Sequence, residues 1–208
     1  MEDRFAESRR NMVEYHLRQR GISDPAVLAA MGKVPRELFM DEAMRERSYF
    51  DGPLPIGRGQ TISQPYIVAA MTEMLEMRGG ESVLEIGTGS GYQAAVLAEI
   101  AARVYTVEVI PELSAAAEKL LSGPLGYRNI FYRVARGQEG WPEFAPFDRI
   151  LLTAAPAEFP PALLEQLGEG GIAVAPVGAG PQRLVRYVKK HGRVRVEEGM
   201  GVIFVPLV

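Results

Sequence analysis

Three glycines at alternate positions, Gly87, Gly89 and Gly91, follow an apolar run at residues 83–86 and precede an alanine-rich stretch. A strand, a glycine turn and a helix in this order bring backbone N–H groups and a helix N-terminus against a nucleotide-like ligand. Because glycine has no Cβ atom, the backbone can approach that ligand closely. A dinucleotide-binding G-x-G-x-x-G turn would need its third glycine at position 92, where this chain has tyrosine. The pattern E-x-G-x-G-x-G therefore favours S-adenosylmethionine over NAD as the ligand.

A carboxylate ends the next predicted strand. Glu108 closes residues 103–108 and lies 21 positions after Gly87. A separation of roughly 20 residues is typical of the carboxylate that accepts hydrogen bonds from ribose hydroxyls. We therefore predict that Glu108 binds the ribose of the cofactor. Glu85, the first residue of the glycine motif, either orients the loop or balances a sulfonium charge, and the sequence leaves both roles open.

Ser63 is the hydroxyl group best placed for chemistry. It stands just before a predicted helix that runs to Met77, with Pro65 in the first turn. One interpretation is a helix N-cap, which contributes about 1 kcal/mol. The other is that the hydroxyl and the helix N–H groups face a carboxylate substrate. The two interpretations are compatible.

The sequence lacks the residue patterns that metal-dependent, hydrolase and NTPase active sites require. The two histidines, His16 and His191, are far apart, and the chain has no cysteine, no Ser-His-Asp order and no Walker loop. We expect no metal ion and no catalytic histidine. Six basic residues lie between positions 183 and 195, but they alternate along a predicted hairpin, so a solvated sheet face is favoured over a nucleic-acid site.

The composition is that of an ordinary globular protein. The 208 residues are 47% hydrophobic and 24% charged, with a net charge of −3, which gives no general attraction to nucleic acid or anionic membranes. The N-terminal MEDRFAESRR is too charged for a secretory signal, and no apolar run has the length of a membrane span. We expect a cytoplasmic monomer without nucleic-acid or membrane partners.

Hydrophobic patterning predicts a single domain over residues 1–208. Residues 1–60 form a helical appendage with helices at 4–20 and 25–33, a turn at 34–39 and an ordered loop at 48–60, and residues 61–208 form the cofactor-binding α/β core. Strand and helix patterns alternate from residue 83, which predicts a mostly parallel sheet with helices on both faces. The predicted segments are strands at 83–86, 103–108, 129–135, 148–153 and 172–177, helices at 93–102, 111–122 and 160–167, a hairpin at 183–189 and 193–197, and a last strand at 202–208.

With these residues in view, nearly the whole chain resembles the protein-L-isoaspartate (D-aspartate) O-methyltransferase family. The matching segments are VPRELF at 34–39, GQTISQPY at 59–66, the glycine motif with Glu108, APFDRI at 145–150, TAA at 153–155, LEQL at 164–167 and MGVIFVPL at 200–207. The GQTISQP segment is the most specific, because methyltransferases in general share only the glycine loop.

The resemblance implies a Rossmann-like S-adenosylmethionine-dependent methyltransferase fold and methylation of the α-carboxylate of isoaspartyl residues in damaged proteins and peptides. It implies that Ser63 is the active-site serine. The implied cofactor-binding positions are Thr61, Ile62, Gln64, Glu85, Gly87, Gly89, Gly91, Glu108, Arg136 and Gly137. The implied substrate-binding positions are Tyr66, Ala154, Ala155 and Val205.

Arg136 departs from the family pattern. The family has an acidic residue here, in a Gly-Asp-Gly segment that contacts the adenine amino group, whereas this chain has Ala135, Arg136 and Gly137. A guanidinium has only donors and cannot accept a hydrogen bond from an amine. Three alternatives follow: a backbone carbonyl accepts instead, Arg136 stacks on the ring, or cofactor affinity is reduced.

The implied reaction needs no strong base. The acceptor is ionised at pH 7, because α-carboxyl groups titrate near 3.3–3.7, so we expect catalysis by positioning, with Ser63 orienting the carboxylate or the cofactor. A flexible substrate peptide could pair with residues 203–206, including Val205. Two alternatives stay open: a methyltransferase with a different, dedicated peptide acceptor, and a non-catalytic peptide-binding relative with impaired cofactor binding.

Overall fold

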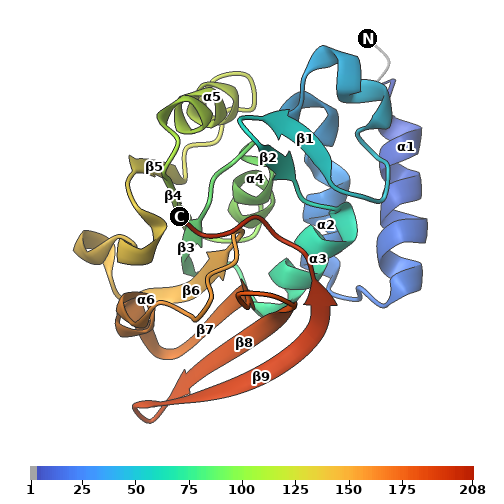
Figure 1. The fold of residues 1–208 in the computed structure, drawn as a ribbon. Coiled ribbons are helices and arrows are strands. Elements are labelled where there is room, and N and C mark those ends of the chain that lie inside the picture. The colour runs from blue at the N-terminus through green and yellow to red at the C-terminus, as the bar shows by residue number, and fades with distance from the viewer. Residues whose placement is uncertain (1–3) are drawn as a thin grey trace.

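A seven-stranded sheet forms the centre of the molecule, in the order β5-β4-β3-β6-β7-β8-β9 (Figure 1). The computed structural model describes residues 4–208, so residues 1–3 of the predicted appendage lie outside it. Neighbouring strands from β5 to β7 are parallel, and β8 and β9 are antiparallel. The strands are β3 (Ser82–Ile86), β4 (Arg103–Glu108), β5 (Ile130–Val134), β6 (Phe147–Leu152), β7 (Leu167–Val177), β8 (Gln182–Lys190) and β9 (Arg193–Val202).

Helices cover both faces of the sheet, as predicted. Alternate residues of one strand face opposite sides, so Val83 belongs to one buried cluster and Leu84 to the other. The first cluster includes residues of α3 (Pro65–Met74), α4 (Tyr92–Ala98) and α5 (Pro111–Ser122). The second includes Leu163 of α6 (Pro161–Gln166). This is the predicted α/β methyltransferase architecture.

The N-terminal helices share the first of these clusters. Helix α1 (Ala6–Asn11) continues through a π-helical stretch (Met12–Leu17) and a 3-10 turn (Arg18–Arg20) to Gly21, which has φ +99°. Helix α2 (Pro25–Lys33) is capped by Asp24, whose side chain accepts from two backbone N–H groups. Short 3-10 turns lie at Arg36–Phe39, Glu42–Arg47, Gly137–Glu139 and Pro142–Phe144. The helices predicted at 4–20 and 25–33 are therefore confirmed.

The prediction of a loop over residues 48–60 was wrong in part. Leu54–Gly57 (β1) and Gln60–Ile62 (β2) pair as an antiparallel hairpin. The prolines at 53 and 55 hide the strand pattern, but a two-stranded sheet has only edge strands, where proline is tolerated. The hairpin matters for function because its second strand leads directly into Ser63.

The prediction of Ser63 as a helix N-cap was also wrong. Helix α3 begins at Pro65, so the N-cap position falls on Gln64, and no side chain caps the helix. Proline suits the first helical position because it lacks an N–H, and this shifts the cap to the residue immediately before it. The helix ends at Met74 rather than Met77, since Leu75 is the C-cap and Glu76 has φ +50°.

The last predicted strand, at residues 202–208, does not form. Strand β9 extends to Val202, and the residues after it make one isolated parallel bridge, between Ala155 and Pro206. Pro206 has no N–H to donate, which prevents regular pairing. The predicted hairpin is confirmed, with longer strands than expected.

Within the described chain, no helix combines the length and apolarity needed to cross a bilayer.

Candidate active site

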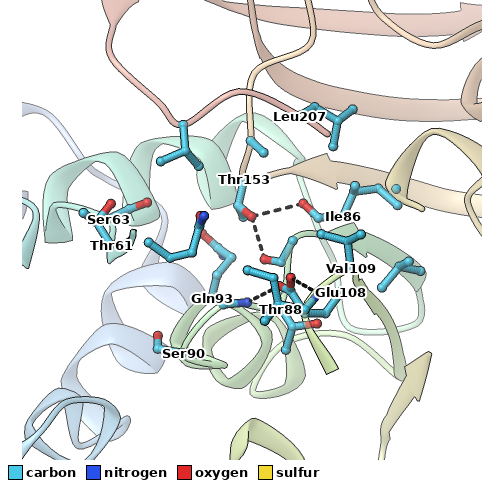
Figure 2. Close-up of a pocket in the computed structure, with 18 of the residues that line it drawn as sticks. Thr61, Ser63, Ile86, Thr88, Ser90, Gln93, Glu108, Val109, Thr153 and Leu207 are labelled. Atoms are coloured by element: carbon cyan, nitrogen blue, oxygen red, sulfur yellow. Dashed lines mark hydrogen bonds between the residues drawn. The ribbon is translucent and has the colours of Figure 1, made fainter. Parts of the chain in front are cut away.

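A pocket opens where the carboxyl ends of β3, β4 and β6 meet. The strand order reverses beside β3, because β4 and β5 lie on one side of it and β6 on the other, and ligands of open α/β sheets bind at such a switch point. The pocket holds about 820 Å³, including its open mouth. Its lining comes from the loops after these strands, the end of β2, the start of α4 and the C-terminal segment 205–208 (Figure 2).

The glycine turn forms the floor of the pocket. Gly87 has φ +98°, and a side chain there would overlap the hydroxyl of Thr153, which follows β6. The Thr153 Oγ1 lies 3.0 Å from the Ile86 carbonyl oxygen and 2.6 Å from that of Gly87, so it holds the turn in place (Figure 2). The turn therefore leaves a cradle that side chains would fill, as a closely approaching ligand requires.

Glu108 supports this turn from β4. Its Oε2 accepts a hydrogen bond from the Gly89 N–H at 2.9 Å, and its Oε1 accepts one from the Ile110 N–H at 3.0 Å. A carboxylate has about four lone-pair sites, so two backbone bonds leave capacity for ligand hydroxyl groups. Both Glu108 and Gly89 line the pocket.

Ser63 reaches the pocket from the opposite wall, together with Thr61 and Ile62. Its backbone carbonyl accepts a hydrogen bond from Nη2 of Arg36 at 2.7 Å. Arg36 is fully buried, donates through Nε to the Ser48 carbonyl at 2.8 Å, and lies over the ring of Tyr92, 4.7 Å from its centroid. Burial lowers the pKa of Arg36, partly offset by the Tyr92 hydroxyl. The serine is thus held by a buried cation that the sequence analysis did not single out.

Nine residues predicted at the site line this pocket, and six do not. The lining residues are Thr61, Ile62, Ser63, Gly87, Gly89, Glu108, Gly137, Ala154 and Val205. Those outside the lining are Gln64, Tyr66, Glu85, Gly91, Arg136 and Ala155.

The six residues outside the lining have other surroundings. Gln64 donates to the Asp51 carbonyl at 3.2 Å, and the ring of Tyr66 lies beneath the guanidinium of Arg20 at 3.9 Å. A side chain at Gly91 would meet Leu121 and Ala117 of α5, so this glycine permits helix packing. Of the other three, Arg136 is exposed, whereas Glu85 and Ala155 are buried.

Several lining residues were missed by the sequence analysis. Most lie at or just after the end of a predicted strand that the structure confirms, or in and after the glycine turn, which is the signal that could have found them; Gln60, Val68 and residues 206–208 carry no such signal. They are Gln60, Val68, Ile86, Thr88, Ser90, Tyr92, Gln93, Val107, Val109, Ile110, Thr153, Pro206, Leu207 and Val208. Between residues 4 and 208, no cluster of three or more His, Cys, Asp or Glu side chains could hold a metal. Backbone donors, one carboxylate and apolar walls instead suit a nucleoside-containing ligand.

Comparisons with known proteins agree with this geometry. The family model of protein-L-isoaspartate(D-aspartate) O-methyltransferase matches residues 7–208. A protein-L-isoaspartate O-methyltransferase of Picosynechococcus is 52% identical over 199 residues, covering 96% of this chain and 89% of the relative. One of Desulfosudis oleivorans is 51% identical over 208 residues, covering 100% of this chain and 94% of the relative.

Solved structures give the same result. One protein-L-isoaspartate O-methyltransferase has a TM-score of 0.87 at 28% identity; the match covers 95% of this chain and 65% of that longer chain. A Plasmodium falciparum protein assigned to the same activity, in complex with S-adenosyl-L-homocysteine, has a TM-score of 0.82 at 25% identity, covering 96% of this chain and 98% of its own. The chain therefore belongs to the protein-L-isoaspartate O-methyltransferase family and is a protein repair enzyme that uses S-adenosylmethionine.

Proposed function

We propose that the glycine turn and Glu108 hold the cofactor, with Glu108 accepting hydrogen bonds from its ribose hydroxyls. The observation that carries this proposal is that Glu108 binds the Gly89 N–H while lining the same pocket. Gly137 supports it as well, because a side chain there would overlap Ile86 and crowd Leu207. The adenine would then lie beside a backbone that has no room for a side chain.

We assign Ser63 the role of orienting the substrate carboxylate. When bound, S-adenosylmethionine supplies a methyl group already activated by the positive sulfonium. The isoaspartyl carboxylate is ionised at pH 7, so no residue needs to remove a proton. The catalytic task is to align the reacting atoms, and a hydroxyl in the wall that faces the cofactor cradle would serve that task. The hold of Arg36 on the Ser63 carbonyl supports this assignment.

The substrate peptide would enter beside Ala154 and Val205. The Ala155 N–H donates to the Val205 carbonyl at 2.8 Å, and the Leu207 N–H donates to the Ala155 carbonyl at 2.9 Å, which fixes this wall. The side-chain amide of Gln182 bonds both backbone groups of Phe204. These bonds use the backbone groups of Phe204 and the carbonyl of Val205, while the neighbouring Ile203 is 98% exposed.

We propose that residues 1–208 act as one domain, since the appendage and the sheet share a buried cluster. We also propose a monomeric and cytoplasmic enzyme, in keeping with the composition and the absence of cysteine.

The test is methyl transfer from labelled S-adenosylmethionine to two peptides that differ only in isoaspartate or aspartate. Wild type should label the isoaspartyl peptide alone. Ser63→Ala should reduce kcat about tenfold or more while leaving cofactor Kd within about twofold, because one positioning hydrogen bond is lost. Ser8→Ala, at an exposed position of α1, is the matched control. Unchanged kcat in Ser63→Ala would contradict the assigned role.

A further inference from the structure

Glu85 is a carboxyl group buried beneath the pocket floor. It has no exposed surface, and its Oε2 accepts a hydrogen bond from Oγ1 of Thr106 at 2.5 Å. The Thr106 Oγ1 lies 2.6 Å from Oγ1 of Thr88, and Thr88 lines the pocket between two glycines of the turn. A chain of two hydroxyl groups therefore connects the buried carboxyl to the pocket wall. The other carboxyl oxygen, Oε1, has no hydrogen-bond partner.

Among residues 4–208, none of the groups that act on the Glu85 carboxyl is a cation. Its neighbours in the sheet are Thr106 on β4 and Leu151 on β6, and Tyr132 on β5 lies beyond Thr106. Burial raises the pKa of Glu85 to about 8, the Thr106 hydrogen bond lowers it, and the carboxylate of Glu108 raises it further.

The described residues of the neighbouring strands and helices also place no positive charge that acts on Glu85. Burial raises the pKa of the Tyr132 hydroxyl, and the carboxyl groups of Glu118 of α5 and Glu85 raise it further. Gln93 of α4 donates to Thr72 of α3. Without a ligand, the neutral form of Glu85 is therefore favoured around neutral pH.

The hydrogen bonds that join Glu85, Thr106 and Thr88 can be arranged in two ways, one for each charge state of Glu85. When Glu85 is ionised it only accepts, so Thr106 donates to it, Thr88 donates to Thr106, and Thr88 offers lone pairs to the ligand. When Oε2 carries a proton, the donors reverse direction and Thr88 offers its O–H to the ligand. A cationic ligand is favoured by the first arrangement, through both charge and hydrogen bonding.

We propose that Glu85, acting through Thr106 and Thr88, is a positioning residue that senses ligand charge and favours the sulfonium cofactor over its neutral product. Binding of the cationic cofactor drives the Glu85 proton to bulk water. After the methyl group has left, the remaining thioether is uncharged, and Glu85 takes a proton back from water. With both groups uncharged, the pocket no longer attracts the thioether product electrostatically, which favours its release.

The proposal can be tested by calorimetry on the full chain with S-adenosylmethionine and S-adenosylhomocysteine. Titrations at pH 7 in buffers of different ionisation enthalpy count the protons released on binding. Wild type should release up to one proton more with S-adenosylmethionine than Glu85→Gln does, and S-adenosylhomocysteine should show no such excess. The comparison with Glu85→Gln is needed because α-amino groups, present in both ligands, titrate near 7.7–8.0.

The affinity ratio gives a second readout. The ratio of the two Kd values measures the preference of wild type for S-adenosylmethionine over S-adenosylhomocysteine. As pH increases towards 8, this preference should increase by up to about tenfold per pH unit, and above pH 8 it should level off. Glu165→Gln, an exposed residue of α6, makes the same change in net charge and should keep the wild-type slope. Thr106→Val should move the rise to higher pH, since loss of the donor raises the pKa of Glu85 further. Equal proton release with both ligands in wild type, or an unchanged slope in Glu85→Gln, would overturn the proposal.

Discussion

The guanidinium of Arg36 donates a hydrogen bond to the backbone carbonyl oxygen of Ser63 at 2.7 Å. The same guanidinium holds the Ser48 carbonyl and lies over the Tyr92 ring. It therefore joins the N-terminal appendage, the pocket wall at Ser63 and the first residue of α4. Because Arg36 is fully buried, solvent cannot replace these bonds.

Arg36→Lys should weaken both stability and catalysis. An ammonium group cannot reproduce the planar geometry of the guanidinium, and each buried carbonyl left unsatisfied costs about 1–3 kcal/mol. We expect unfolding in urea to show a loss of that size and kcat/KM for the isoaspartyl peptide to fall about tenfold. Arg47→Lys, an exposed arginine near the ring of Phe50, should change neither value measurably. Normal activity in Arg36→Lys would show that Ser63 keeps its position without this bond.

Glu108→Gln should weaken cofactor binding about 10- to 100-fold. An amide has one acceptor oxygen, whereas Glu108 uses both carboxylate oxygens to accept from Gly89 and Ile110. The amide would place a donor against a backbone donor and would also lose acceptors for the ribose. Calorimetry with S-adenosylhomocysteine measures the effect, and Glu112→Gln, in an exposed ion pair with Arg58, is the control. A change in Kd below about twofold would argue against ribose binding by Glu108.

Arg136→Asp should tighten cofactor binding about fivefold, the effect of one hydrogen bond of about 1 kcal/mol. The present side chain is exposed and does not line the pocket, while Gly137 beside it does. Arg136→Ala should therefore leave Kd within about twofold and serves as the matched control. No gain from aspartate would indicate that another acceptor already serves the adenine amino group.

The parts of the fold that depend on local patterns could be predicted from the sequence. The bounds of β4 and α5 match the predicted 103–108 and 111–122, because each has a strong periodic pattern and a clear start. The burial of Arg36 could not be predicted, because it depends on carbonyl groups 12 and 27 positions away. Likewise, Thr106 looks like any strand threonine until pairing of β3 with β4 places it beside Glu85.

Stability of the cofactor-free protein should fall as pH rises from about 5 to 8, and Glu85 should account for part of that fall. The pKa of Glu85 is raised from 4.5 to about 8 on folding, chiefly by burial. Between these values the folded protein holds a proton that the unfolded chain has lost, so stability decreases by up to about 1.4 kcal/mol per pH unit. Urea unfolding at several pH values measures the slope. Glu85→Gln, which cannot ionise, should flatten it, and Glu165→Gln should not. Equal slopes in wild type and Glu85→Gln would mean that Glu85 is ionised in the folded protein throughout this range.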